Sequence, residues 1–379
     1  MPTSSKVYFT DLRASVRRNL LSKLVMLMDI AGLEDIITPR SLVALKLHFG
    51  EKGNTAFIRP LFIRQIVERV KELGASPFLT DANTLYAGSR GNSISHINTA
   101  IENGFAYSVV NAPIIIADGI RGASHSKVMI DQEMIKTAYL GKEIVESDAL
   151  ISIAHFKGHE LSGFGGTIKN LGMGCASRKG KLDQHSGLSP KIKRRKCIGC
   201  GDCILHCAQN AISLKDEKAM IDTHKCVGCG ECILICPNGL IEVSWNADTE
   251  AFQKKLGEYS LAVLKEKQGK ALFLNFLTNI SPACDCYGHS DASIVHDIGI
   301  LASKDPVAID QASVDLVNRV PAAHDCCIKN SRMPGDDKFR DIYPKIDWNV
   351  QLEHAKKIGL GSRKYELVTL PLKTGAPPS

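Results

Sequence analysis

The chain has 379 residues, of which 44% are hydrophobic and 23% are charged, and its formal net charge is +7. This composition is ordinary for a globular protein, and the length gives room for two or three domains. Residues 1–20 carry no signal-peptide pattern and no apolar run approaches the length of a bilayer span, so we expect a cytoplasmic protein without a membrane span.

The N-terminal half alternates between predicted strands and helices. Apolar runs predict strands at residues 7–10, 42–49, 77–81, 113–117 and 149–155. Helical spacing predicts helices at residues 20–33, 60–73 and 94–102. This alternation is typical of a mostly parallel sheet with helices on both faces, so we expect an α/β main domain.

Polar residues follow several of the predicted strands. In such sheets ligands bind at the carboxyl ends of the strands. The rule predicts a pocket near five side chains, which are Lys46, His48, Asp81, Asn83 and Asp118. The alternative interpretation is that each of them only caps or bounds a turn.

A glycine-rich run with three histidines, and with Lys169 among its lysines, occupies residues 155–185. Glycine allows the backbone to approach a ligand closely, and the N–H groups of such loops bind anions. The predicted catalytic residues are His159, Lys169 and His185. The predicted cofactor-binding residues are Gly165, Gly166 and Asn170. We expect Lys169 to act either as a phosphate or carboxylate contact or as a nucleophile.

Two copies of one cysteine pattern follow, and each has the spacing C-x2-C-x2-C-x3-C. Bacterial ferredoxins with two [4Fe–4S] clusters have this spacing, and the fourth cysteine of each run binds the other cluster. One predicted cluster is held by Cys197, Cys200, Cys203 and Cys236. The other is held by Cys226, Cys229, Cys232 and Cys207. The first copy ends in Cys207-Ala208, where the bacterial pattern has proline.

Two other interpretations of the cysteine runs are weaker. A zinc site takes four ligands and does not need three cysteines in a tight loop followed by a fourth. Here that arrangement occurs in both runs. A disulfide framework suits short secreted chains. We therefore expect a protein with two [4Fe–4S] clusters in a reducing compartment.

A basic run at residues 191–196 precedes the first cysteine. It is either a solvated linker or a docking surface for an acidic redox partner. Such a partner would be a ferredoxin or a flavodoxin that donates or accepts electrons. No nucleic-acid-binding motif accompanies it, so we expect no nucleic acid partner.

Residues 190–245 are thus a predicted α+β ferredoxin domain, inserted into a discontinuous main domain at residues 1–189 and 246–379. Beyond the insert, a helix at residues 249–268 and strands at 270–275 and 365–370 return to the main domain.

The Cys284-Asp285-Cys286 sequence has two interpretations. The thiols either bind a metal with help from His289, Cys326 or Cys327, or are buried, cluster-shielding thiols. We do not expect two thiols at this spacing to close a strain-free disulfide readily.

The layout resembles the DUF362 family, whose members lack an assigned function and often carry a ferredoxin insert. The matching segments are residues 159–174, His185, Cys284-Asp-Cys286 and residues 297–310. The resemblance supplies a family and no reaction.

A remoter likeness is to lactate racemases that hold a nickel-pincer nucleotide. There too a histidine precedes a Gly-Gly-x-x-Lys run and another histidine follows. The likeness implies that His159 and His185 sit at a metal or substrate and that Lys169 anchors the cofactor. Residues 55–60 resemble the phosphate-binding Thr-Arg-Pro of that family, with residues inserted.

Three functions remain open. The clusters pass single electrons to a substrate or cofactor site in the α/β domain, which would make the protein a ferredoxin-type oxidoreductase acting on an unknown small molecule. Alternatively, the protein is a non-catalytic electron carrier or docking protein. The third possibility is a nucleotide or organometallic-cofactor enzyme on the racemase-like scaffold.

Overall fold

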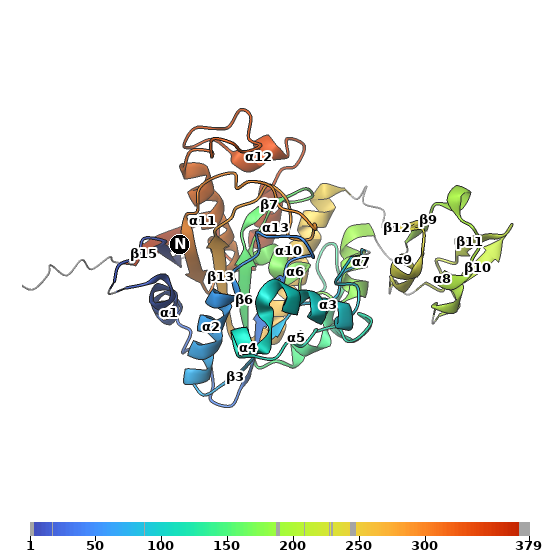
Figure 1. Cartoon of the computed structure of the whole chain (residues 1–379), viewed down its shortest axis with the longest axis horizontal. Coiled ribbons are helices and arrows are strands. Elements are labelled where there is room, and N and C mark those ends of the chain that lie inside the picture. Colours follow the sequence, from blue (N-terminus) through green and yellow to red (C-terminus); the bar gives the residue numbers. More distant parts are fainter. Residues whose placement is uncertain are drawn as a thin grey trace, which may run out of the picture.

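A seven-stranded sheet forms the centre of the computed structural model, which describes residues 4–16, 18–86, 88–186, 190–207, 209–226, 228, 230–242 and 248–370 (Figure 1). The strand order is β15-β1-β14-β13-β6-β2-β3. The strands are β1 (Ser5–Asp11), β2 (Leu42–Lys46), β3 (Ser76–Thr80), β6 (Ala149–His155), β13 (Ala271–Leu277), β14 (Gly299–Ser303) and β15 (Tyr365–Thr369).

Most of this sheet is parallel, as predicted. Strand β14 pairs antiparallel with both of its neighbours, β1 and β13. All other neighbouring strands pair in parallel. The carboxyl ends of β2, β3, β6 and β13 therefore meet at one edge of the sheet, where a ligand site is expected.

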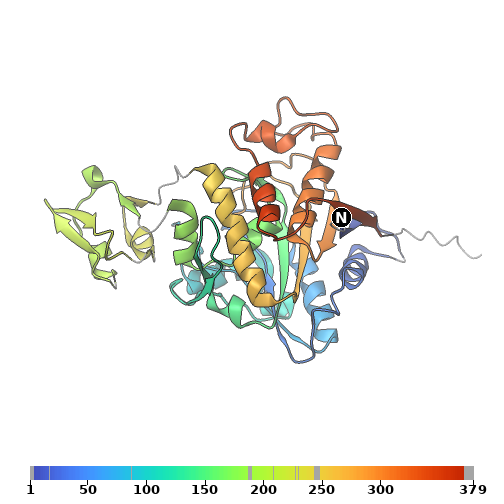
Figure 2. The ribbon, with the colours of Figure 1, turned by 180° about the vertical axis from the view of Figure 1, so that it is seen from behind.

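Helices cover both faces of the sheet. Along β13, Leu272 and Leu274 belong to one hydrophobic core, and Ala271 and Phe273 belong to the other. Successive side chains of a strand point to opposite faces, so a strand buried on both faces is apolar throughout. One core includes α1 (Leu20–Ile30) and α2 (Pro60–Glu72). The other includes α10 (Thr249–Lys267), α11 (Pro306–Arg319) and α13 (Asn349–Lys357). The long helix α10 faces the viewer in Figure 2.

Shorter elements complete the main body. The helices are α3 (Ser93–Ala100), a π-helical turn (Ile101–Phe105), α4 (Tyr107–Val110), α5 (Lys142–Glu146), α6 (Thr167–Gly172), α7 (Arg178–Ser186) and α12 (Lys338–Ile342). Two hairpins pair β4 (His125–Met129) with β5 (Thr137–Gly141), and β7 (Lys157–His159) with β8 (Gly163–Gly165). No described helix combines the length and apolarity needed to cross a bilayer.

The predicted strand at residues 113–117 is wrong as a regular strand. The segment runs along β3 and forms an isolated bridge between Leu79 and Ile114. Backbone bonds join Ile115 N to Leu79 O and Ala117 N to Asp81 O. Pro113 lacks an N–H group, so it can only accept a bond from this edge position.

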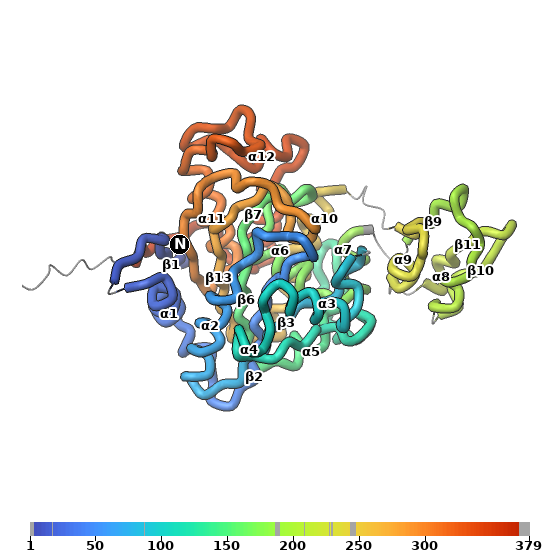
Figure 3. The backbone as a smooth tube through the Cα atoms, in the orientation of Figure 1, coloured from blue at the N-terminus to red at the C-terminus, as the bar shows by residue number. Residues whose placement is uncertain are grey.

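Residues 190–242 form a cysteine-rich lobe beside the main body (Figures 1 and 3). Antiparallel pairs join β9 (Lys191–Ile192) to β12 (Ile241–Glu242), and β10 (Ile212–Lys215) to β11 (Lys218–Ile221). Its helical segments are a 3-10 turn (Arg194–Lys196), α8 (Asp202–Leu205) and α9 (Glu231–Ile235). Buried side chains from its strands and helices, including Cys203, Ile212 and Ile233, form a small core.

The two halves of the lobe repeat one another. Helix α8 follows Gly201 and α9 follows Gly230, and both glycines have positive φ values, of 85° and 69°. A side chain would strain this conformation, so glycine permits the tight turn in each cysteine run. The duplicated sequence thus has a duplicated local structure.

Candidate functional site

A cavity of about 630 Å³ lies at the carboxyl edge of the sheet. This volume is in the range of small-molecule sites. Lys46, His48 and Asp81 line it, as their positions after β2 and β3 predict. Asn83 and Asp118 do not line it. Instead, the Asn83 backbone and side-chain N–H groups both donate to Asp118 Oδ1, at 2.9 and 2.8 Å, which fits the turn-bounding alternative.

The glycine-rich run places its polar residues in this cavity. Strand β6 leads directly into the β7–β8 hairpin, which carries His159, and then into helix α6, which carries Lys169 and Asn170. These three side chains and His185 from α7 all line the cavity. The structure therefore brings the three residues predicted to be catalytic together in one cavity.

The two predicted cofactor glycines do not line the cavity. Gly165 makes room for Lys169, since an added Cβ would lie 2.9 Å from its Cδ atom. Gly166 precedes α6, where Asp310 accepts bonds from Thr167 N and Ile168 N at 2.7 and 2.9 Å. The start of α6 is capped by this carboxylate, so both glycines serve the packing that positions Lys169.

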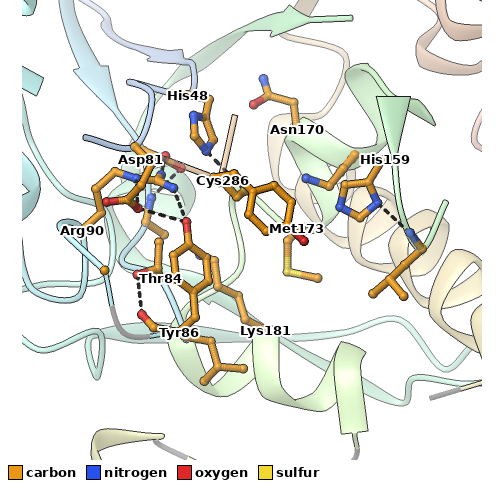
Figure 4. A pocket seen from close by; sticks show the side chains of 18 of the residues that line it. His48, Asp81, Thr84, Tyr86, Arg90, His159, Asn170, Met173, Lys181 and Cys286 are labelled. Carbon is orange, nitrogen blue, oxygen red and sulfur yellow. Dashed lines mark hydrogen bonds and ion pairs between the residues drawn. The ribbon is translucent and has the colours of Figure 1, made fainter. Parts of the chain in front are cut away.

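Two thiols form the centre of the site. Lys169 Nζ lies 3.3 Å from Cys284 Sγ, and Cys284 Sγ lies 2.9 Å from Cys286 Sγ. His48 Nε2 lies 3.5 Å from Cys286 Sγ. Because His48 Nδ1 accepts a 3.0 Å bond from Gly50 N, its Nε2 carries the hydrogen and donates toward the sulfur. Figure 4 shows His48 and Cys286 between the Arg90 and Asp81 side chains and His159.

These contacts favour the thiolate form of one of the two cysteines. The hydrogen bond from Cys284, together with Lys169 and His48, lowers the pKa of Cys286 well below its usual value despite burial. The bond to Cys286 and burial raise the pKa of Cys284. Burial opposes the charge of Lys169, but the nearby thiols and Glu160 outweigh it and raise the lysine pKa. The contacts therefore favour an ammonium on Lys169, a thiol on Cys284 and a thiolate on Cys286.

A buried carboxylate fixes the Cys284–Cys286 loop. Asp285 Oδ2 lies 2.8 Å from His155 Nδ1 and 3.8 Å from Lys157 Nζ. Its backbone oxygen accepts a 3.0 Å bond from Glu51 N. Burial opposes ionisation, but His155 and Lys157 lower the pKa of Asp285 below its usual value. Asp285 thus anchors the segment that carries both thiols.

The Asp285→Asn substitution is expected to destabilise the fold by about 3 kcal/mol, because it leaves buried cationic partners uncompensated. Urea unfolding at neutral pH checks this, with the exposed Asp291→Asn as control and an expected change within about 0.5 kcal/mol. Since the folded-state pKa is depressed, the contribution is present above about pH 4 and is lost at lower pH. Equal stability of both variants at neutral pH would contradict the anchoring role.

His159 presents an N–H group to the cavity. Leu161 N donates to His159 Nδ1 at 3.3 Å, and Ser162 Oγ lies 3.0 Å from the same nitrogen. Nδ1 is therefore an acceptor, and Nε2 carries the hydrogen of the neutral ring. Burial and Lys169 lower the pKa of His159 well below its usual value, so the ring is neutral.

His185 lies on the ring of Phe252, with ring centroids 4.9 Å apart. Burial, followed by Lys169, lowers the pKa of His185 to about 3. Both predicted catalytic histidines are therefore uncharged at neutral pH, and the lysines supply the positive charge of the cavity.

A buried ionic network forms the opposite wall, and two of its members, Glu51 and Arg90, were not predicted from the sequence. Lys46 Nζ lies 3.0 Å from Asp81 Oδ1 and donates to Asn170 Oδ1 at 2.9 Å. Arg90 Nη1 lies 3.4 Å from Asp81 Oδ2, and its Nε lies 3.2 Å from Glu51 Oε2. The strand-end rule predicted Lys46 and Asp81 on this wall.

Positive side chains outnumber carboxylates among the described residues that line the cavity. The cationic residues are Lys46, Arg90, Lys157, Lys169 and Lys181. The carboxylates are Glu51, Asp81 and Glu160, and the favoured thiolate form of Cys286 is a fourth negative group, so one cation remains in excess. An excess of buried cations favours a negatively charged ligand.

Anion affinity is expected to fall as the pH rises through about 8. Burial lowers the pKa of Lys181 to about 8, so this lysine loses its charge there. Calorimetric titration with sulfate, whose charge is constant in this range, measures the effect. The Lys181→Met variant is expected to have a flat profile near pH 8, and an identical decline in that variant would contradict the assignment.

The cysteines of the lobe separate into two sets. Cys197, Cys200, Cys203 and Cys236 line one small hollow. Cys207, Cys226 and Cys232 line a second hollow, and the predicted fourth member, Cys229, lies outside the described residues. These are the groupings that the crossed ligand pattern predicts.

Backbone N–H groups point at the sulfurs. Ala211 N donates to Cys207 Sγ and Leu240 N donates to Cys236 Sγ, both at 3.3 Å. Ala219 N donates to Cys197 Sγ at 3.4 Å, and such bonds lower the pKa of Cys197. Hydrogen bonds of this kind stabilise thiolates and tune cluster potentials, so the donor set fits iron–sulfur clusters. The described residues contain no group of three or more His, Cys, Asp or Glu side chains that could hold a single metal ion.

The lobe contacts the main body through its second cysteine run. Glu231 pairs with Arg178 at 2.6 Å and with Arg121 at 2.7 Å. A Cβ added at Gly230 would lie 2.6 Å from Leu85 Cδ1. Leu85 also lines the cavity, so one side chain separates the second cysteine run from the candidate site.

Cys326, Cys327 and His289 do not line the cavity. The residue that contacts Cys286 instead is His48, which is 238 positions away in the sequence. The structure therefore does not bring these three predicted metal ligands into the cavity beside Cys286.

The fold and the site define a mixed α/β protein with a ligand-sized cavity at the strand ends and a cysteine-rich lobe beside it. The chain belongs to the family described as "Domain of unknown function (DUF362)", which matches residues 43–315, more than half of its length. No curated protein matches the sequence.

Two solved structures are similar to this chain. One is the lactate racemase apoprotein from Thermoanaerobacterium thermosaccharolyticum, with 13% identity and a TM-score of 0.37, covering 80% of this chain and 57% of the other. The second is a structural-genomics protein from Thermotoga maritima, with 12% identity and a TM-score of 0.36, covering 68% of this chain and 49% of the other. The chain thus spans about half the length of these proteins.

Proposed function

We propose that the lobe carries two [4Fe–4S] clusters and passes single electrons to a small anionic molecule bound in the cavity of the α/β domain. The observation that supports this most strongly is the position of Leu85, which contacts the second cysteine run and also lines the cavity. When bound, the clusters supply one-electron reduction. The chain would then be an oxidoreductase.

The two cysteine sets have different surroundings. The set with Cys207, Cys226 and Cys232 belongs to the half of the lobe that touches the main body, so we assign it as the inner, electron-delivering site. The set with Cys197 is the outer site, where Cys200 is exposed and Ile198 is 68% exposed. An exposed outer site suits electron entry from a partner protein.

The basic run at residues 191–196 lies next to the outer site. Lys191, Lys193, Arg195 and Lys196 are exposed. A positive surface attracts a negatively charged protein and accelerates its association at low ionic strength. We therefore propose an acidic one-electron carrier, such as a ferredoxin or a flavodoxin, as the donor.

The cavity residues would bind and orient the substrate. Lys169, Lys157 and Lys181 supply positive charge, and His159 Nε2 carries a hydrogen that can be donated to the bound anion. The apolar side chains of Leu85, Met173 and Phe252 also line the cavity and limit its water. These residues exclude solvent and hold an anion close to the inner site.

The Glu231→Gln substitution tests the route of the electrons. It removes the two ion pairs that join Glu231 to the main body, leaves every cysteine in place, and is expected to slow electron delivery to the cavity about tenfold, in line with the loss of a buried charge contact. Stopped-flow reoxidation of the reduced protein by anthraquinone-2-sulfonate, a small anion, measures this. Hexaammineruthenium(III), a cation that can meet the exposed outer site directly, is the control oxidant and should react at an unchanged rate.

Two results would decide against the proposal. Equal rates with anthraquinone-2-sulfonate in the wild type, in Glu231→Gln and in Lys169→Met would mean that the oxidant does not use the cavity. A loss of iron from Glu231→Gln would instead show that this glutamate holds the clusters, so the iron content is measured on the same samples.

A further inference from the structure

The Cys284–Cys286 pair has a geometry that electron entry alone does not require. Their sulfurs lie 2.9 Å apart, and each has its own polar partner, Lys169 for Cys284 and His48 for Cys286. Cys284 is buried, and Cys286 lines the cavity. The sulfur of Cys286 can therefore contact a ligand in the cavity, and the sulfur of Cys284 lies buried next to it.

The pair differs from the other cysteines of the main body. Cys175 is buried, and burial raises the pKa of its thiol to about 11, which makes it unreactive. Cys326 and Cys327 are adjacent in sequence but do not line the cavity. Among the described cysteines of the main body, Cys284 and Cys286 are the pair with a close sulfur–sulfur contact and a neighbouring cation, and Cys286 also lines the cavity.

The two sulfurs are in direct contact, with Cys284 Sγ as the donor and Cys286 Sγ as the acceptor. Asp285, between them, is held by His155, so the backbone keeps both cysteines on one side of the loop. This is the arrangement of an attacking thiol and a resolving thiol.

We propose that Cys284 and Cys286 are a redox-active pair that collects two electrons from the lobe, one at a time, and delivers them together to a small anionic disulfide. This inference rests on the proposed function for the source of its electrons. It also revises the expectation that thiols at this spacing do not readily close a disulfide.

The reaction consists of two thiol–disulfide exchange steps followed by reduction of the protein disulfide. The Cys286 thiolate attacks one sulfur of the substrate disulfide, forms a mixed disulfide and releases the first substrate thiolate. Cys284 then attacks the Cys286 sulfur, and its proton goes to the second substrate thiolate, which leaves. The protein disulfide finally takes two electrons and one proton, which restores the Cys284 thiol and the Cys286 thiolate. The electrons come from the one-electron carrier through the lobe.

The surroundings of the pair suit each step. Lys169 stabilises the negative charge that the first electron adds to the disulfide, since its ammonium lies 3.3 Å from Cys284 Sγ. The hydrogen of His48 Nε2 stabilises the Cys286 thiolate. The cations of the cavity attract the substrate anion, and Phe252 and Leu85 contact its apolar part.

The test uses full-length protein under anaerobic conditions and 5,5′-dithiobis(2-nitrobenzoate), an anionic disulfide, as the probe. The Cys284→Ser variant is expected to accumulate a mixed disulfide of the probe on Cys286, because the resolving thiol is missing. The wild type is expected to form the Cys284–Cys286 disulfide instead. Alkylation with iodoacetamide followed by peptide mass spectrometry distinguishes the two states. The Cys326→Ser/Cys327→Ser variant is the matched control and should behave like the wild type at the cavity.

A second stage separates this inference from the proposed function. Reduced flavodoxin is added to the oxidised wild type, and the clusters are followed by EPR while the thiols are trapped. Return of both thiols in the wild type, and not in Cys232→Ala, supports the relay. If Cys284→Ser forms no adduct and the wild type forms no disulfide, the proposal of a redox-active cysteine pair fails while the proposed function stands. A disulfide that persists while the clusters are reduced overturns electron delivery to the cavity, and with it the relay.

Discussion

Replacing Cys232 with alanine is expected to lower the iron content from about eight to about four atoms per chain and to abolish electron delivery to the cavity. Cys232 lies in α9, on the side of the lobe that contacts Leu85 and Arg178, and it lines the inner hollow. Without this ligand the inner cluster is not held. Iron analysis and the reoxidation assay with anthraquinone-2-sulfonate measure both effects.

The matched control is Cys203→Ala, which removes a ligand of the outer set. It should lose the same amount of iron, but a small reductant such as dithionite can still reach the inner cluster, so delivery to the cavity should survive. Cys327→Ala, at an exposed cysteine outside the lobe, should keep all of the iron. A Cys232→Ala protein with its full iron content would contradict the ligand assignment, and loss of delivery only in Cys203→Ala would reverse the order of the sites.

The Lys169→Met variant is expected to lose about 100-fold in affinity for anions and at least about tenfold in the alkylation rate of Cys286 at pH 7. Its ammonium is buried, lies 3.3 Å from Cys284 Sγ and is among the groups that lower the pKa of Cys286. Removing it raises that pKa, so less thiolate is present at neutral pH. Sulfate calorimetry and iodoacetamide trapping at several pH values measure the two effects.

Lys169→Arg keeps the charge and should retain most of the reactivity of Cys286. The midpoint of the alkylation profile should move to higher pH in Lys169→Met and stay near the wild-type value in Lys169→Arg. If the two variants shift the midpoint equally, the effect is one of packing, and the electrostatic account of this site fails.

Local patterns predicted the parts of the molecule that depend on neighbouring residues. The cysteine spacing predicted which cysteines share a hollow, because each run folds as one tight loop around glycines with positive φ. Apolar runs predicted the strands of the central sheet except β14, and the strand-end rule placed Lys46, His48 and Asp81 at the cavity. These inferences need only the period of a strand and the direction of a parallel sheet.

The remaining site residues depend on contacts between distant segments. His155 and Asp285 are 130 positions apart, and the backbone of Thr167 meets Asp310 across 143 positions. No local pattern shows that Asp310 caps α6, which is why Gly166 was predicted to bind a cofactor. Arg90 was missed for a similar reason, since its partner Glu51 comes from another loop, 39 positions away.

The most direct test of the proposed function is iron analysis combined with EPR on protein purified and reduced without oxygen. The account predicts about eight irons per chain and the signals of two reduced [4Fe–4S] clusters, which disappear when an anionic oxidant enters the cavity. Fewer than about four irons per chain, or zinc held by the cysteines of the lobe, would contradict it.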